Sequence, residues 1–511
     1  MFSNRRWAWN RVAKASFLGG CALVFALEWA SSNSICCGQD EDFATKAQRN
    51  WHQWRGASSD GTAPQSSLPT EWNETKNTKW KVELPGKGSG TPIVWEDRIY
   101  LMAAIDLAPA EPSTPAETEA PKNPPPDSGR GRSTDLAAES IEADSGNSSR
   151  RRERQNRDAQ EGQEGEGRRP GRGGGQRAAT KQQFVVLCLD RDSGKEVWRK
   201  TMIEAVPHEA GHNTNTFASA SLVVDGQRIY ANFGSRGFYC LDMQGEVVWE
   251  KDLGFMRTRN GFGEGSSPSV YGDTVVVPWD HEEQSALIAL NAKTGEEKWR
   301  VDRDERTTWA TPLITPFGDR VQVIVNGSRV RSYDLENGNL IWECGGQVGN
   351  PIPSPVRYGD HVICMTGYQG YAIVSMALDS QGDITDSKKV AWTGGGAAPY
   401  VPSPALYEER LYFVKSNNPV MVVRDVKTGK IIVDETRLPK MRAIYASPVA
   451  ADGKIYFCSR EGVVVVIKHG DSGEVLAVNE MGEPIDASPA IVGNQMFIRG
   501  EKHLYCITET N

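Results

Sequence analysis

A short hairpin signature recurs along this chain. In its clearest copy an apolar run ends at Asn291, Gly295 supplies the turn, and Trp299 lies at the start of the next run. Glycine adopts a positive φ without strain, and apolar runs on either side of such a turn are typical of a β-hairpin. The chain is therefore predicted to be built of repeated hairpins. Further copies span residues 189–198, 241–249 and 333–342, with degraded copies at 425–433 and around Gly473.

A Ser-Pro or Thr-Pro dipeptide precedes most of these hairpins. Proline at the start of a strand loses no ladder hydrogen bond, which favours the innermost strand of a blade. The dipeptides begin at Thr91, Ser267, Thr311, Ser354, Ser403, Ser447 and Ser488, and the stretch 219–221 fills the one gap. Eight units with a period of about 40 to 50 residues predict an all-β fold: an eight-bladed β-propeller of four-stranded antiparallel blades.

The last repeat unit has only three strands before the chain stops. The strand expected at 78–84 precedes the first unit and can serve as the missing fourth strand. Such closure removes the open sheet edges that would otherwise pair with other chains. We therefore expect an N-terminal strand to close the last blade.

The sequence divides into four segments. Basic residues followed by an apolar run predict a signal peptide or membrane anchor over 1–38, and hence export to the periplasm or cell envelope. An N-terminal extension is expected over 39–71 and the propeller over 72–511. Residues 106–183, rich in Pro, Glu, Ser, Gly and Arg, interrupt the first unit and have the composition of a disordered insertion.

The composition favours some partners over others. The formal net charge is −8, and the basic residues are not pooled in the repeats, so nucleic acid is not favoured. We expect a monomer, with membrane attachment through the N-terminus as an alternative to free export. Nine cysteines are present; Cys188, Cys240 and Cys506 occupy matching repeat positions, which indicates buried small apolar sites.

One stretch matches a metalloprotease pattern. His208-Glu209-Ala210-Gly211-His212 reads H-E-x-x-H, in which a helix places both imidazoles on one side of a zinc ion. Proline before the stretch and glycine within it favour a loop instead, so we expect no metal site, with His208 and His212 as the candidates should one exist.

Cations recur in the long loops that alternation places on one face of the propeller. Converging around its mouth, they would attract a small anionic ligand or an acidic surface of a protein partner. The alternative is that they are solvated loop tips. The candidate binding residues are Arg236, Arg329, Lys415, Arg442 and Arg460.

The hairpins, the Ser-Pro strands and the eight-fold count resemble the bacterial PQQ-like propeller repeat family. That family includes quinoprotein dehydrogenases and the propeller lipoprotein of the outer-membrane assembly machine. The resemblance implies that Trp198, Trp249, Trp299 and Trp342 dock neighbouring blades. For the dehydrogenases it also implies pyrroloquinoline quinone (PQQ), calcium, an aspartate base and a vicinal disulfide. The repeats here lack the adjacent cysteine pair, and the calcium ligands and the base cannot be placed.

Two functions follow from these features. The favoured one is an exported, non-catalytic binding or scaffold protein that uses its long-loop face, and hence not an enzyme. The alternative is a PQQ-dependent oxidoreductase of the alcohol or sugar dehydrogenase type, with PQQ and Ca²⁺ at the cationic mouth.

Overall fold

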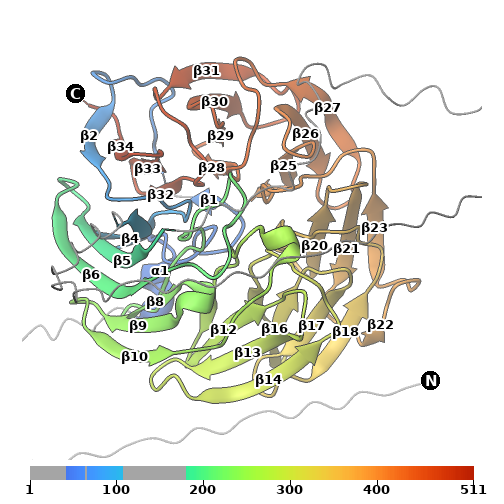
Figure 1. Ribbon diagram of the computed structural model, residues 1–511. Coiled ribbons are helices and arrows are strands. Elements are labelled where there is room, and N and C mark those ends of the chain that lie inside the picture. The colour runs from blue at the N-terminus through green and yellow to red at the C-terminus, as the bar shows by residue number, and fades with distance from the viewer. Residues whose placement is uncertain (1–41, 64–65, 108–179, 511) are drawn as a thin grey trace, which may run out of the picture. The chain divides into compact units, whose positions relative to one another are not determined.

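The computed structural model describes residues 42–63, 66–107 and 180–510. The described residues from Phe43 onward form one compact unit, in which eight mainly antiparallel sheets are arranged around a common centre (Figure 1). The prediction of an eight-bladed propeller is confirmed. Helix is confined to α1 (Phe43–Ala47) and two single turns within the described residues.

The blades follow the order of the chain. Blade 1 comprises β3 (Ile93–Trp95), β4 (Arg98–Asp106), β5 (Gln182–Asp190) and β6 (Glu196–Ala205). Blade 2 comprises β7 (Val223–Val224), β8 (Arg228–Asn232), β9 (Phe238–Asp242) and β10 (Val247–Lys251). Blade 3 comprises β11 (Ser269–Tyr271), β12 (Thr274–Trp279), β13 (Ser285–Asn291) and β14 (Glu297–Arg303). Blade 4 comprises β15 (Leu313–Phe317), β16 (Arg320–Val325), β17 (Val330–Asp334) and β18 (Leu340–Cys344), with β22 (Gly382–Asp383) added in parallel.

The second half repeats this order. Blade 5 comprises β19 (Val356–Tyr358), β20 (His361–Thr366), β21 (Ala372–Ala377) and β23 (Val390–Gly394). Blade 6 comprises β24 (Ala405–Tyr407), β25 (Arg410–Val414), β26 (Val420–Asp425) and β27 (Ile431–Arg437). Blade 7 comprises β28 (Val449–Ala451), β29 (Lys454–Cys458), β30 (Val463–Lys468) and β31 (Val475–Glu480). Blade 8 comprises β32 (Ala490–Val492), β33 (Gln495–Arg499) and β34 (His503–Ile507), completed by β2 (Thr78–Glu83).

The N-terminal strand closes the ring as expected. Strand β2 pairs antiparallel with β34, and Trp80 lies opposite Cys506. The middle strands of the blades are buried on both sides, whereas the outer strands alternate between half-buried and exposed residues. This pattern places the apolar core between the blades. All six cysteines among the described residues are buried and free.

Hydroxyl groups link the first strands of neighbouring blades. At the start of seven blades a backbone N–H donates to the Ser or Thr hydroxyl at the start of the next blade, at 2.8 to 3.2 Å. The hydroxyl of Thr91 donates to the carbonyl of Ser488 at 3.0 Å and completes the circle. We call this the hydroxyl ring; its members are Thr91, Ser221, Ser267, Thr311, Ser354, Ser403, Ser447 and Ser488. The recurring Ser-Pro dipeptide therefore carries a contact between blades as well as a strand start.

Indole rings link the blades nearer their outer edge. Trp249 packs over Gly295 of the next blade, so close that a β-carbon there would lie 2.7 Å from the ring, and its N–H donates to the Ala292 carbonyl. Gly295 has a φ of 71°, a conformation that glycine adopts without strain. The same arrangement pairs Trp80 with Gly194, Trp198 with Gly245, Trp299 with Gly338 and Trp392 with Gly429.

Trp342 makes its contact with the next blade through an intermediary. Its N–H donates to Gln322 at 3.0 Å within its own blade, and the Gln322 amide donates to the Leu378 carbonyl of blade 5 at 2.8 Å. The indole itself packs among the apolar side chains of blades 4 and 5. Trp342 is therefore a buried core residue whose polar link to blade 5 passes through Gln322.

The described part of the 39–71 segment packs into the centre of the propeller. Strand β1 (Thr62–Ala63) pairs in parallel with β28, the innermost strand of blade 7. Arg55 is 1% exposed and donates to the carbonyls of Pro404 and Pro448 at 2.6 and 2.7 Å. Burial lowers the pKa of Arg55 to about 10. Sequence analysis missed this role, because the partners of Arg55 are backbone atoms more than 300 residues away.

Two predicted segments fall outside the described residues. The signal peptide or anchor over 1–38 does so entirely, and most of the 106–183 insertion does so. The described ends of the insertion join β4 to β5, where Leu107 bonds to Lys181. In the ranges that the structure describes, no helix combines the length and apolar character needed to cross a membrane.

The hydroxyl ring predicts the effect of a small substitution. Ser403 is buried and accepts a hydrogen bond from the Ser354 N–H at 2.9 Å. Ser403→Ala leaves that N–H without a partner, so we expect it to lower the free energy of unfolding by about 1 to 3 kcal/mol. Ser403→Thr keeps a hydroxyl, as Thr91 and Thr311 do, and is expected to retain most of the stability. Urea denaturation of both variants tests this, and equal midpoints for Ser403→Ala and the wild type would contradict it.

Candidate functional site

One face of the propeller carries the connections from the second to the third strand of each blade and from each blade to the next. We call this the loop face. At the loop face, blades 1 to 3 contain a cavity of about 1180 Å³. Segments 207–220, 232–236, 256–266 and 307–309 supply most of its walls. These segments are connections between strands, so the blades act as the frame that positions them.

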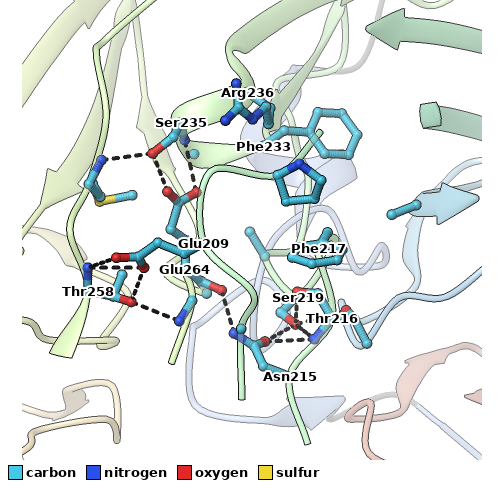
Figure 2. A pocket seen from close by; sticks show the side chains of 18 of the residues that line it. Glu209, Asn215, Thr216, Phe217, Ser219, Phe233, Ser235, Arg236, Thr258 and Glu264 are labelled. Carbon is cyan, nitrogen blue, oxygen red and sulfur yellow. Dashed lines mark hydrogen bonds between the residues drawn. The ribbon is translucent and has the colours of Figure 1, made fainter. Parts of the chain in front are cut away.

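Two carboxylates lie close together in this cavity (Figure 2). The Glu264 carboxylate accepts hydrogen bonds from the Ser235 N–H, at 2.9 Å, and from the Ser235 hydroxyl. The Glu209 carboxylate accepts from the N–H of Thr258, at 3.0 Å, and from its hydroxyl. Each carboxylate is thus held by one residue through a pair of neutral donors.

Burial decides the protonation of Glu264. It raises the pKa of this carboxyl to about 7, and the nearby charge of Glu209 acts in the same direction. The hydrogen bonds from Ser235 and the charge of Arg236 oppose the shift. Gly234 makes the close approach possible, because a β-carbon there would lie 1.5 Å from the Glu264 carboxylate. Glu264 therefore changes charge near neutral pH.

The H-E-x-x-H stretch forms part of the cavity wall as a loop. His208 bonds through Nε2 to the Met256 carbonyl at 2.6 Å, and His212 bonds through Nδ1 to Thr214 at 2.8 Å. Each imidazole thus has its own partner, and Glu209 is bound to Thr258. Within residues 42–63, 66–107 and 180–510, no group of three or more His, Cys, Asp or Glu side chains is arranged to hold a metal ion.

Three of the five candidate binding cations form ion pairs with carboxylates of the chain. Arg329 pairs with Asp383 at 2.7 Å and Glu343 at 3.0 Å. Arg460 pairs with Asp486 at 2.8 Å and lies over the Tyr445 ring. Lys415 pairs with Glu435. These three cations lie on different blades, and their local charge is largely neutralised.

The other two cations are placed differently. Arg442 is exposed on the connection that follows blade 6. Arg236 lines the cavity, and its guanidinium lies 5.3 Å from the centre of the Phe255 ring. His208 packs against the same ring from 5.3 Å. Arg236 is therefore the candidate cation that belongs to the cavity of blades 1 to 3.

The sequence analysis missed Glu264, Ser235 and Thr258. Their roles depend on contacts between connections of different blades, which the repeat pattern does not register. A signal does exist, because Glu264 lies in a Gly-Phe-Gly-Glu-Gly stretch whose glycines at 261 and 263 have positive φ. Glycine-rich connections of this kind bring the backbone close to neighbouring groups.

The pKa of Glu264 predicts how stability depends on pH. Its folded-state pKa lies above the ordinary value of 4.5, so its contribution to stability is complete below pH 4.5 and is lost as pH rises to about 7. Glutamine cannot ionise, so the Glu264→Gln variant does not lose stability in this way. We therefore expect its melting temperature, relative to that of the wild type, to increase between pH 5 and pH 8. Glu336→Gln, at an exposed position, is the matched control and should follow wild type. Parallel curves for Glu264→Gln and wild type would contradict the assignment.

Comparison with known proteins finds relatives for parts of the chain. A PQQ-like family model described as "Outer membrane protein assembly factor BamB" matches residues 182–432. BamB of Moranella endobia is 23% identical over 327 residues, which cover 62% of this chain and 80% of that protein. BamB of Yersinia pestis is 26% identical over 174 residues, which span 32% of this chain and only 40% of that protein. A methanol dehydrogenase subunit of Methylobacterium organophilum is 25% identical over 152 residues, or 25% of this chain and 23% of the subunit.

Solved structures agree on the architecture. The quinohemoprotein alcohol dehydrogenase of Comamonas testosteroni superposes with a TM-score of 0.58 at 10% identity, covering 92% of this chain and 82% of that one. A europium-containing methanol dehydrogenase also gives 0.58 at 10% identity, covering 91% and 92%. At this identity the likeness concerns the fold alone. The sequence match to the PQQ-like repeat family therefore covers residues 182–432, and the eight blades have the propeller fold of the solved structures.

Proposed function

We propose that this chain is an exported, non-catalytic binding protein that captures a protein partner through its loop face. The observation that carries the proposal is the exposure of Phe255 on the connection between blades 2 and 3. At 62% it is the most exposed large hydrophobic side chain in the part of the chain that the structure describes. A large apolar side chain held in water favours burial against a partner.

The surroundings of Phe255 suit such a contact. Arg236 lies over one side of the ring and the His208 imidazole packs nearby, so the phenyl group is held in place before binding. Val206, 53% exposed, adds apolar area on the connection between blades 1 and 2. Aromatic and arginine side chains contribute much of the binding energy at protein interfaces, and preordered ones lose less entropy.

The relatives support the same proposal. The Moranella endobia protein that matches over 80% of its length is named an outer membrane protein assembly factor. A protein with that name acts on other proteins, and we extend that class of function to this chain as part of the proposal. Export through the segment 1–38 also belongs to the proposal.

A photocrosslinking residue at position 255 tests the proposal. We expect it to give a discrete crosslinked product in cells, because Phe255 would be covered by the partner. Tyr271 is the matched control: it is also an exposed aromatic residue, 42% accessible, but lies beside the short turn between β11 and β12. A product from position 255 and none from 271 is expected. Equal labelling from both positions, or none from 255, would overturn the proposal.

The alternative function requires PQQ, and the candidate residues do not fit it. PQQ carries carboxylates and would need several free cations directed at one place. Arg329, Lys415 and Arg460 are instead paired with carboxylates of the chain, on three different blades. Pairing of this kind lowers the potential available to an anionic cofactor.

Titration with PQQ separates the two functions. We expect no saturable change in the PQQ absorbance when the purified propeller is added, with or without Ca²⁺, at micromolar concentrations. A quinoprotein alcohol dehydrogenase stripped of PQQ serves as the positive control. Stoichiometric binding followed by dye reduction with an alcohol or a sugar would favour the oxidoreductase instead.

A further inference from the structure

We propose that the cavity between blades 1, 2 and 3 binds a small organic molecule that carries an ammonium group. This site adjoins the proposed protein contact at Phe255, because Arg236 and His208 line the cavity and also contact the Phe255 ring, but its test does not depend on that contact. Three observations support it: two carboxylates that form no ion pair with a described residue, aromatic walls, and an amide donor in the cavity wall that bonds to no described residue.

The carboxylates of Glu209 and Glu264 are held by neutral donors alone. Thr258 and Ser235 each donate an N–H and a hydroxyl, and neither carboxylate forms an ion pair with a residue in the described ranges. The charge of Arg236 acts on Glu264 without forming an ion pair with it, and the guanidinium lies over the Phe255 ring. A carboxylate removed from water is stabilised by a cation at short range, so this end of the cavity favours a positive ligand.

The remaining acidic groups of the cavity are already satisfied. Asp280 forms a buried ion pair with Arg303 at 2.8 Å and accepts the Thr308 hydroxyl at 2.7 Å. Asp106 accepts hydrogen bonds from Gln182 and Thr180, which lower its pKa. Glu209 and Glu264 are therefore the carboxylates of this cavity at which a positively charged ligand group would be most favourable.

Aromatic side chains form walls that suit an organic cation. Phe217 and Phe233 line the cavity near the carboxylates (Figure 2), and Trp309 lines it from blade 3. The Trp309 N–H donates to the Gly263 carbonyl at 2.8 Å, which fixes the orientation of the indole. An ammonium group is attracted to the face of an aromatic ring, and more strongly where water is displaced.

An amide in the cavity wall can bind a hydrogen-bond acceptor of the ligand. Asn232 is 4% exposed and lines the cavity. Its Oδ1 accepts from the Gly234 N–H at 2.9 Å, whereas its Nδ2 donates to no residue among those described. This N–H group is open to the cavity, so an acceptor on a bound molecule can bind to it. The volume of about 1180 Å³ suits a small organic molecule.

Three matched compounds test the charge of the ligand. Tyramine carries an ammonium group, 4-ethylphenol is its neutral counterpart, and 3-(4-hydroxyphenyl)propionate carries a carboxylate. In calorimetric titrations of the full chain at pH 8, where Glu264 is ionised, we expect tyramine to bind at least tenfold more tightly than either of the others. Equal binding of all three compounds, or no binding of tyramine at 10 mM, would overturn the proposal.

Two variants tie this preference to the carboxylates. Glu264→Gln and Glu209→Gln keep the size of the side chain and are each expected to reduce the preference for tyramine over 4-ethylphenol at least fivefold. Glu336→Gln, an exposed position in blade 4, is the control and should leave it unchanged. Because Glu209→Gln is independent of Glu264, a folding defect in one variant leaves the other as a test. An unchanged preference in both glutamine variants would refute the site.

The pH and a peptide supply two further checks. At pH 5.5 Glu264 is largely protonated, so the affinity for tyramine should fall in the wild type and change less in Glu264→Gln. A capped Gly-Lys-Gly peptide presents the same ammonium group on a polypeptide. If that peptide binds at least as tightly as tyramine, the site recognises a lysine of a protein instead, and the assignment to a small molecule is wrong.

Discussion

The hydroxyl ring is the interaction on which the rest of the propeller depends. Seven of the eight blades begin with a backbone N–H that donates to a hydroxyl of the next blade. Because the last link runs from Thr91 to Ser488, the ring is complete only when the first and last blades meet. A buried N–H without a partner costs about 1 to 3 kcal/mol, so an incomplete ring is disfavoured at each break. The indole contacts farther out, such as Trp249 over Gly295, fix the angle between blades that the ring leaves free.

This division of roles leaves the loop face free to vary. Glu209, Glu264 and Phe255 take no part in the hydroxyl ring, whose members Ser221 and Ser267 lie at the far ends of the same connections. Substitutions in the connections can therefore change the cavity without opening the ring. Because the blades carry the stability and the connections carry the site, proteins as different as an assembly factor and a dehydrogenase can share this fold.

The fold could be predicted from the sequence because its signals are local and repeated. The hairpin around Gly295 and the Ser-Pro strand starts recur with one period, and the strand at 78–84 was the natural partner for an incomplete last unit. The site could not be predicted in the same way. Arg329 and Arg460 were placed in the correct connections, but their partners Asp383 and Asp486 come from separate parts of the chain. Arg55 was missed for the same reason, since carbonyl groups of the backbone leave no mark in a sequence.

Closure by an N-terminal strand also sets the order in which the molecule can be completed. Strand β2 leaves the ribosome before blades 1 to 7, yet its partner β34 follows all of them. During synthesis β2 is thus an edge strand that waits without a partner, the situation in which strands of different chains pair and aggregate. Its sequence, Thr-Lys-Trp-Lys-Val-Glu, places Lys79, Lys81 and Glu83 on the side that stays exposed. Charged side chains at every second position oppose pairing between copies of the strand. The strand that closes the finished ring therefore also lowers the tendency of the growing chain to aggregate.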